Sequence, residues 1–256
     1  MTDIEINRMS LLDHLQELRK RLLFSFLAVC IGSIACWFFY QEILDLLLDP
    51  YCSIRASSLG EGIFGSGCEL LVTDPLEPFS VRLTVAGYGG LILSIPIILW
   101  QAWRFIAPGL LKREKRWALP FIFSGVLLFA AGAFLAYWSI PRALDFLVGI
   151  GGPDLVSMFS PARYIGFVIK MIVAFGVGFE FPLFLIFLQL MGVITPDALR
   201  KSRRYAIVGI VALVAVLTPS GDPFTLLVLS VPMIIFYELS ILFGAIRKRK
   251  LRSEIE

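Results

Sequence analysis

Four glutamates stand where a carboxylate needs a physical explanation. Glu180 and Glu238 lie deep in long apolar segments, where an ionised side chain costs about 2.5–3.5 kcal/mol on insertion scales. Glu17 and Glu114 lie among basic residues that flank such segments. A carboxylate accepts two parallel hydrogen bonds from one guanidinium group, so acids on a basic surface are suited to binding a ligand that carries arginine.

The two acids in basic segments differ in their local partners. Glu114 has no cation at helical spacing, because the residues three and four positions away are Leu110, Leu111, Trp117 and Ala118. It is either free to bind a cationic ligand, or else solvated or paired with another loop. Glu17 stands four residues before Arg21, a spacing that favours a helical ion pair of about 0.2–0.5 kcal/mol. Glu17 is therefore either half of that pair or a second acid for ligand binding.

The acids in apolar segments have three possible roles. Each can be a proton relay, a polar docking point for another protein's helix, or a protonated group that donates a hydrogen bond. Lys170 precedes Glu180 by ten residues, so the two cannot pair along one helix. In a competing interpretation, Glu180, Glu238 and Lys170 are the coupling residues of a proton-coupled secondary transporter, but the two halves of the chain show no convincing inverted repeat.

Other chemistry is poorly supported. His14 is the only histidine and the chain has no CxxC pair, so we expect no metal site and no cofactor. The chain has no GxSxG, HExxH or P-loop motif, and we expect that it is not an enzyme. Cys52 and Cys68 lie in one connecting segment, where they either form a disulfide of about 3 kcal/mol or remain free thiols.

The elements that position these residues are six apolar segments. The chain is 58% hydrophobic and 17% charged, which is typical of an integral membrane protein. We predict an all-α fold with a single membrane domain over residues 1–256. The predicted spans are about 22–40, 79–100, 118–140, 165–190, 205–217 and 224–246.

The fifth segment is short. Its apolar residues reach only about 20 Å as a helix, so either the bilayer is thinner there or neighbouring helices cover the ends of the segment.

The charges orient the chain in the membrane. Eighteen of the 23 Lys and Arg residues fall in four clusters at ends of apolar segments, whereas the alternate loops are acidic. Loops rich in Lys and Arg stay in the cytoplasm, so we predict that both termini are cytoplasmic and that the acidic loops are outside. Topology and lipid headgroups account for the basic excess without nucleic acid.

Turn-forming residues predict the shape of the bundle. Asp49, Pro50 and several glycines lie between residues 41 and 78, and predict an outer cap of short irregular segments.

Leucines at helical spacing predict an amphipathic helix over residues 10–22. Prolines within or beside the spans favour bent helices around a concave face, although ordinary kinking would also explain them: Pro96, Pro120, Pro141, Pro182 and Pro232.

The chain carries four motifs in sequence order: His14–Arg21, Trp103–Arg116, Phe175–Pro182, and Leu217–Pro219 followed by Asp222. Together they resemble the TatC family, the multispanning core of the twin-arginine protein translocase, over about residues 10–245. The resemblance implies a six-helix cupped bundle in the bacterial cytoplasmic (inner) membrane. It also implies that the chain binds twin-arginine signal peptides and assembles with single-span TatA and TatB proteins in an oligomeric complex. The complex would export folded proteins by using the proton-motive force.

The resemblance also implies roles for particular residues. Glu17, Arg19, Phe105, Pro108 and Glu114 match the family's signal-peptide surface. Glu180 matches the buried acid of the fourth span, and Pro50 and Asp222 match residues of the outer loops. The chain departs from the family at Leu226, where a glutamine often stands, so a polar role there is in doubt.

Overall fold

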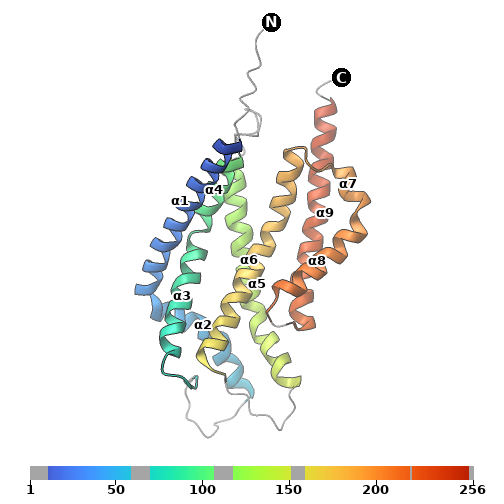
Figure 1. The fold of residues 1–256 in the computed structure, drawn as a ribbon. Helices are drawn as coiled ribbons and strands as arrows, with labels where there is room; N and C mark the ends of the chain where they lie inside the picture. The colour runs from blue at the N-terminus through green and yellow to red at the C-terminus, as the bar shows by residue number, and fades with distance from the viewer. Residues whose placement is uncertain (1–10, 59–69, 107–117, 151–158, 220, 254–256) are drawn as a thin grey trace.

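The computed structural model describes residues 11–58, 70–106, 118–150, 159–219 and 221–253. These residues form α-helices and no strand, which confirms the predicted all-α class (Figure 1). The helices are α1 (Leu11–Phe38), α2 (Tyr40–Ser58), α3 (Glu77–Leu93), α4 (Ile95–Ile106), α5 (Ala118–Ile150), α6 (Pro161–Leu190), α7 (Pro196–Lys201), α8 (Arg203–Leu217) and α9 (Pro223–Ser253).

Four helices in the described ranges are long and apolar enough to cross a membrane: α1, α5, α6 and α9. A fifth span forms if α3 and α4 are taken together, since they meet at a bend of 50°. Pro96 lies in the first turn of α4, where it lacks the N–H needed to continue α3. The span predicted at residues 79–100 is therefore a broken helix. The predicted span at 205–217 corresponds to α8, which has 15 residues and is shorter than the other spans.

The long helices run between two ends of the bundle. The first described helix begins and the last one ends at the same end, which we call the near end (Figure 1). α2 lies at the opposite end, which we call the far end, and there α3 and α6 begin. The predicted amphipathic segment at residues 10–22 is not a separate element, because it continues into the first span as the single helix α1.

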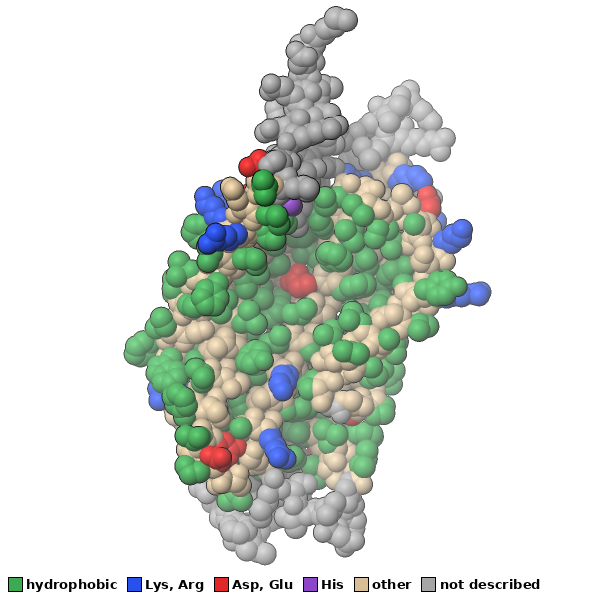
Figure 2. All heavy atoms as spheres, viewed as in Figure 1, with side chains coloured by type: hydrophobic (Ala, Val, Ile, Leu, Met, Phe, Trp, Pro, Cys, Tyr) green, Lys and Arg blue, Asp and Glu red, His purple; other side chains and the backbone are tan. Residues whose placement is uncertain are grey.

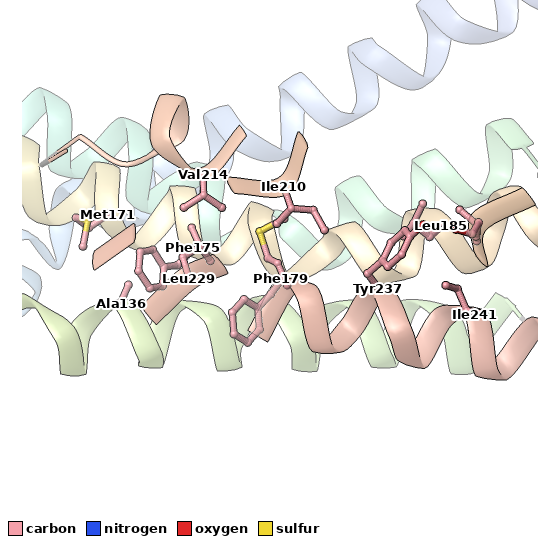
Figure 3. Close-up of a cluster of buried hydrophobic side chains, with 12 residues drawn as sticks. Ala136, Met171, Phe175, Phe179, Leu185, Ile210, Val214, Leu229, Tyr237 and Ile241 are labelled. Atoms are coloured by element: carbon pink, nitrogen blue, oxygen red, sulfur yellow. Dashed lines mark hydrogen bonds between the residues drawn. The ribbon is translucent and has the colours of Figure 1, made fainter. Parts of the chain in front are cut away.

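The main core forms where α6 packs against α8 and α9 (Figure 3). Phe175 and Phe179 of α6 meet Leu229 and Tyr237 of α9 in a fully buried cluster, and Val214 contributes from α8. The Tyr237 hydroxyl donates to the Leu199 carbonyl oxygen at 2.7 Å, so the polar tip of this buried ring is satisfied. This core fixes α6, which carries Glu180.

Small residues let α1 approach α3 closely. A Cβ atom added at Gly90 of α3 would lie 2.3 Å from the backbone nitrogen and from the Oγ of Ser33 on α1. Gly32 of α1 faces the same contact, since a Cβ there would lie 2.9 Å from the Gly90 carbonyl oxygen. Membrane helices gain little from hydrophobic burial against lipid, so such close backbone packing is a main source of their association.

A carboxylate joins α3 to α6 at the far end. Glu77 is the first residue of α3 and is only 7% exposed. Its Oε1 accepts from the Ala162 backbone N–H at 2.9 Å, and its Oε2 accepts from the Thr73 N–H at 3.2 Å. Ala162 lies in the first turn of α6, whose own N-cap residue Ser160 makes no side-chain cap bond. An acid from another helix therefore caps α6.

The prediction of an irregular outer cap is wrong for its first part, because residues 40–58 form the helix α2 with Pro50 inside it. Proline cannot donate to the carbonyl of the residue four positions earlier, which is Leu46. The Tyr137 hydroxyl of α5 donates to that carbonyl at 2.9 Å, and the Tyr164 hydroxyl of α6 donates to the Leu47 carbonyl at 2.9 Å. Side chains from distant helices thus supply hydrogen bonds to the α2 backbone beside its proline.

We expect Tyr137→Phe to destabilise the docking of α2 by about 1 kcal/mol, because the Leu46 carbonyl oxygen loses the hydroxyl that bonds it. Thermal unfolding of the purified protein measures the change. Tyr88→Phe on α3 is the control, since no hydrogen bond of the Tyr88 hydroxyl is found among the described residues. Equal unfolding temperatures for the two variants would contradict the role of Tyr137.

The cysteines differ in state. Cys52 at the far end is disulfide-bonded, whereas Cys30 and Cys36 in α1 are free. Cys68, the fourth cysteine of the chain, lies outside the described residues. Of the two alternatives for Cys52, the disulfide is the one that the structure contains.

Candidate functional site

The near end of α1 is held against α4 by a polar chain that contains Glu17. The Arg21 Nη2 atom donates to Glu17 Oε1 at 2.9 Å, one helical turn away. The Arg21 Nη1 atom donates to Gln101 Oε1 of α4 at 3.3 Å. The helical ion pair expected from the sequence is therefore present, and Gln101 extends it to a second helix.

An aromatic contact lies beside this polar chain. The His14 ring of α1 stacks on the Phe105 ring of α4, with centroids 4.4 Å apart and an interplanar angle of 25°. Trp103, which is 3% exposed, fixes α4 from the other side by packing on Phe121 of α5 at 4.8 Å. The structure thus brings Glu17 and Phe105 to the same junction of α1 and α4.

The junction can still accept a cation. The Glu17 side chain is 18% exposed, and its Oε2 atom makes no hydrogen bond to any residue that the structure describes. An incoming guanidinium group can bond this oxygen directly, and can bind both oxygens if Arg21 moves to Gln101 alone. The geometry and charge of this junction are suited to an arginine-bearing ligand, and such binding needs no covalent step.

Arg19 lies on a different face of α1 from Glu17. It lines a shallow apolar groove on the outer side of this helix together with Leu15, Leu18, Leu22, Leu23 and Phe26. The structure does not bring Arg19 to the junction of Glu17 and Phe105. Two further predicted site residues, Pro108 and Glu114, lie outside the described residues.

Glu180 lies on α6 at the seam with α4 and α5. A Cβ atom added at Gly125 of α5 would lie 3.3 Å from Glu180 Oε2 and 2.7 Å from a methyl group of Leu99. The Oε1 atom of Glu180 is buried and finds no hydrogen-bond partner among the described residues. Lys170 is exposed and does not pair with it. The seam therefore presents an acid with unused hydrogen-bonding capacity beside apolar side chains. The face of the molecule drawn in Figure 2 is largely hydrophobic, with few charged side chains in its middle part.

The prediction that Glu238 is a second buried acid is wrong. Its Oε2 atom accepts from Arg203 Nη2 at 2.6 Å, and its side chain is 41% exposed. Arg203 begins α8, which the sequence does not place beside residue 238. Near this pair, Lys248 binds Asp197 of α7, and this hydrogen bond and charge lower the pKa of the Asp197 carboxyl from its ordinary value. Ion pairs thus hold α7, α8 and α9 together at the near end.

The two residues predicted for outer loops have structural contacts. Asp222 is 3% exposed, and its Oδ1 atom accepts from the Thr225 N–H at 2.7 Å, so it caps α9. Pro50 is buried within α2. Both lie towards the far end of the bundle, away from Glu17.

Gln101 and the stack of His14 on Phe105 were not predicted from the sequence. Gln101 gave little signal in the sequence, because it directly follows the span predicted at residues 79–100, where a polar residue is ordinary. Its partner could not be named, since Arg21 is 80 residues away in the chain.

Comparison with known proteins places these features in a family. Residues 13–232 match the family model described as Sec-independent protein translocase protein (TatC). The TatC protein of Frankia casuarinae is 38% identical over 249 residues, which cover 96% of this chain and 68% of that protein. The TatC protein of Aquifex aeolicus is 38% identical over 251 residues, covering 97% and 99% of the two chains. A crystal structure of the twin arginine translocase receptor TatC superposes with a TM-score of 0.73 at 38% identity, covering 91% of this chain and 98% of that one.

Proposed function

Because the chain belongs to the TatC family of Sec-independent protein translocase proteins, we propose that it is the translocase subunit that binds twin-arginine signal peptides. The protein is a membrane-embedded component of a transport system and not an enzyme. The solved relative described as the twin arginine translocase receptor supports a receptor role for this chain.

The observation that carries this proposal is the half-used carboxylate of Glu17 at the junction of α1 and α4. One oxygen is bonded to Arg21 and the other has no partner among the described residues. Each arginine of a signal peptide offers a planar pair of N–H donors that matches a carboxylate. In our proposal Glu17 binds one arginine and Glu114 the other. The Phe105 ring packs beside them, and Pro108 and Arg19 complete the surface.

We further propose six membrane crossings with both termini in the cytoplasm. The clusters of Lys and Arg support this orientation, and so does the return of α9 to the end at which α1 begins (Figure 1). α8 is the shortest crossing, at about 22 Å for 15 residues. Tyr205 and Val216 near its two ends are each 83% exposed, which favours a thinned bilayer over protection by neighbouring helices.

In the proposed topology the bent pair α3–α4 and the proline-containing helices α5, α6 and α9 would form a cupped wall that carries Glu180. We propose that Glu180, with its unbonded Oε1, is the polar contact for single-span TatA and TatB partners in an oligomeric complex in the bacterial inner membrane. The complex would draw on the proton-motive force. Pairing with Arg203 weakens the case for Glu238 as a coupling residue of a secondary transporter.

A binding assay separates the receptor from the transporter. Purified full-length protein should bind a labelled peptide that contains paired arginines and an apolar segment, and should bind it more tightly than the same peptide with paired lysines. A transporter would instead bind small metabolites and show no preference between the two peptides.

We expect Glu180→Ala to impair export, because it removes the proposed polar contact for partner helices. Peptide binding and folding should be nearly unchanged, because Glu180 Oε1 makes no hydrogen bond in the described structure that folding would lose. Glu180→Gln keeps hydrogen-bonding capacity without charge, so it shows whether the charge is needed. The measurement is the amount of folded cargo protected inside inverted membrane vesicles. Normal export by both variants would remove Glu180 from the mechanism.

A further inference from the structure

The far half of α6 carries two cations without a partner in the described part of the chain. Arg163 and Lys170 are both exposed, and neither makes a hydrogen bond or an ion pair with a described residue. α6 is one of the helices that are apolar and long enough to span a membrane. A cation on such a helix is costly unless an anionic group or water meets it, so this pair calls for a ligand from outside the chain.

The two cations share one face of α6, with an open notch between them. They are seven residues apart, which is close to two helical turns and about 10.5 Å along the axis. Gly166 lies between them on that face, and a Cβ atom added there would meet no atom within 4 Å. A group can therefore lie against the helix backbone at Gly166 with a positive charge on each side.

The depth of the two side chains matches the headgroup region of a bilayer. Arg163 lies about 3 Å along the axis from the start of α6, and Lys170 about 14 Å from it. Side chains on a helix lean towards its N-terminus, which for α6 is the far end, so the Lys170 stem of about 6 Å can carry its ammonium group towards the surface. Both charges then lie within reach of one lipid headgroup.

We propose that Arg163, Gly166 and Lys170 form a binding site for the phosphate group of a phospholipid in the leaflet at the far end. Arginine binds phosphate through paired N–H donors and lysine binds it as a point charge. Every phospholipid carries this phosphate at the depth of Arg163, whereas an acidic protein helix would have to place its carboxylate against an open glycine at the membrane surface. This favours a lipid over a protein partner.

Arg142, an exposed cation on α5, differs from Arg163 and Lys170 because its charge is met within the chain. The Arg142 guanidinium lies 3.9 Å from the centroid of the Trp138 ring and donates to the Trp138 carbonyl oxygen at 3.2 Å. Arg142 therefore has a partner within its own helix, which Arg163 and Lys170 lack. The site lies at the far end of the bundle and is independent of signal-peptide binding at the near end.

Native mass spectrometry of the full-length protein in detergent tests the site by titration with phosphatidylglycerol. We expect Arg163→Gln and Lys170→Gln each to weaken binding of the tightest lipid about fivefold, and the double variant about 30-fold. Gly166→Leu, which fills the notch and keeps both charges, should also weaken it. Arg142→Gln is the matched control and should bind lipid like the unchanged protein.

Diacylglycerol, which has the same tails and no phosphate, distinguishes headgroup recognition from tail packing. We expect the unchanged protein and the double variant to bind diacylglycerol equally weakly. Unchanged affinity for phosphatidylglycerol in the double variant and in Gly166→Leu would overturn the proposal. It would also be overturned if the variants lost diacylglycerol as strongly, or if a carbodiimide cross-linked Lys170 to a carboxylate of a copurifying protein.

Discussion

Glu17→Lys is expected to weaken binding of a paired-arginine peptide by more than the truncation Glu17→Ala does. Hydrogen bonds to charged groups contribute about 1.5–3 kcal/mol, so Glu17→Ala should weaken binding by roughly 10- to 150-fold. Lysine at this position should do worse, because it places a cation beside Arg21 and repels the incoming arginine. Glu114→Lys should have a comparable effect if that residue binds the second arginine.

The measurement is peptide affinity at fixed salt, with the Arg-Arg and Lys-Lys peptides compared for each variant. Gln16→Lys is the matched control. Gln16 is exposed on α1 beside Glu17, so this substitution adds a cation without removing the Glu17 carboxylate. Thermal stability should change little, because Arg21 keeps its bond to Gln101. If Glu17→Lys and Glu114→Lys both bind the Arg-Arg peptide like the unchanged protein, these acids are not the binding site.

The largest effect on stability is expected at the contact of α1 with α3. Gly90→Ala would place a Cβ atom 2.3 Å from the Ser33 backbone nitrogen, a distance that neither helix can accept without moving. Overpacking typically costs 1–3 kcal/mol, and a clash with backbone belongs at or above the upper end of that range. We therefore expect a loss of about 3 kcal/mol, or about 10 °C in the unfolding temperature.

Gly87→Ala is a control on the same helix, because a Cβ atom at Gly87 meets no atom within 4 Å. It should leave the unfolding temperature nearly unchanged. Since α1 carries Glu17, Gly90→Ala should also weaken binding of the paired-arginine peptide. Equal stability of the two variants would show that α1 and α3 are not packed as closely as described.

Local patterns in the sequence predicted part of this structure well. The apolar segments became helices, Pro96 marked the bend between α3 and α4, and the spacing of Glu17 and Arg21 predicted their ion pair. Such features depend on residues within one or two helical turns, so a single sequence contains what is needed to find them.

Features that depend on distant partners were missed. Asp49 and Pro50 have the composition of a turn, but α2 continues through them because Tyr137, 91 residues from Leu46, supplies a donor. Glu238 has the position of a buried acid but pairs with Arg203, 35 residues away. In both cases tertiary contacts overrode a local preference, and a single sequence does not reveal which distant residues meet.

The cap that Glu77 provides for α6 has a consequence for how the protein is made. The ribosome synthesises the carboxylate 85 residues before the Ala162 N–H that it accepts from, so α3 is available before α6 leaves the ribosome. The start of α6 can therefore be satisfied as soon as that helix enters the membrane beside α3. A fragment that begins after α4 lacks this carboxylate, so the first turn of its α6 loses the acceptor that Glu77 supplies to the Ala162 N–H. Insertion of the second half of the protein thus depends chemically on the first.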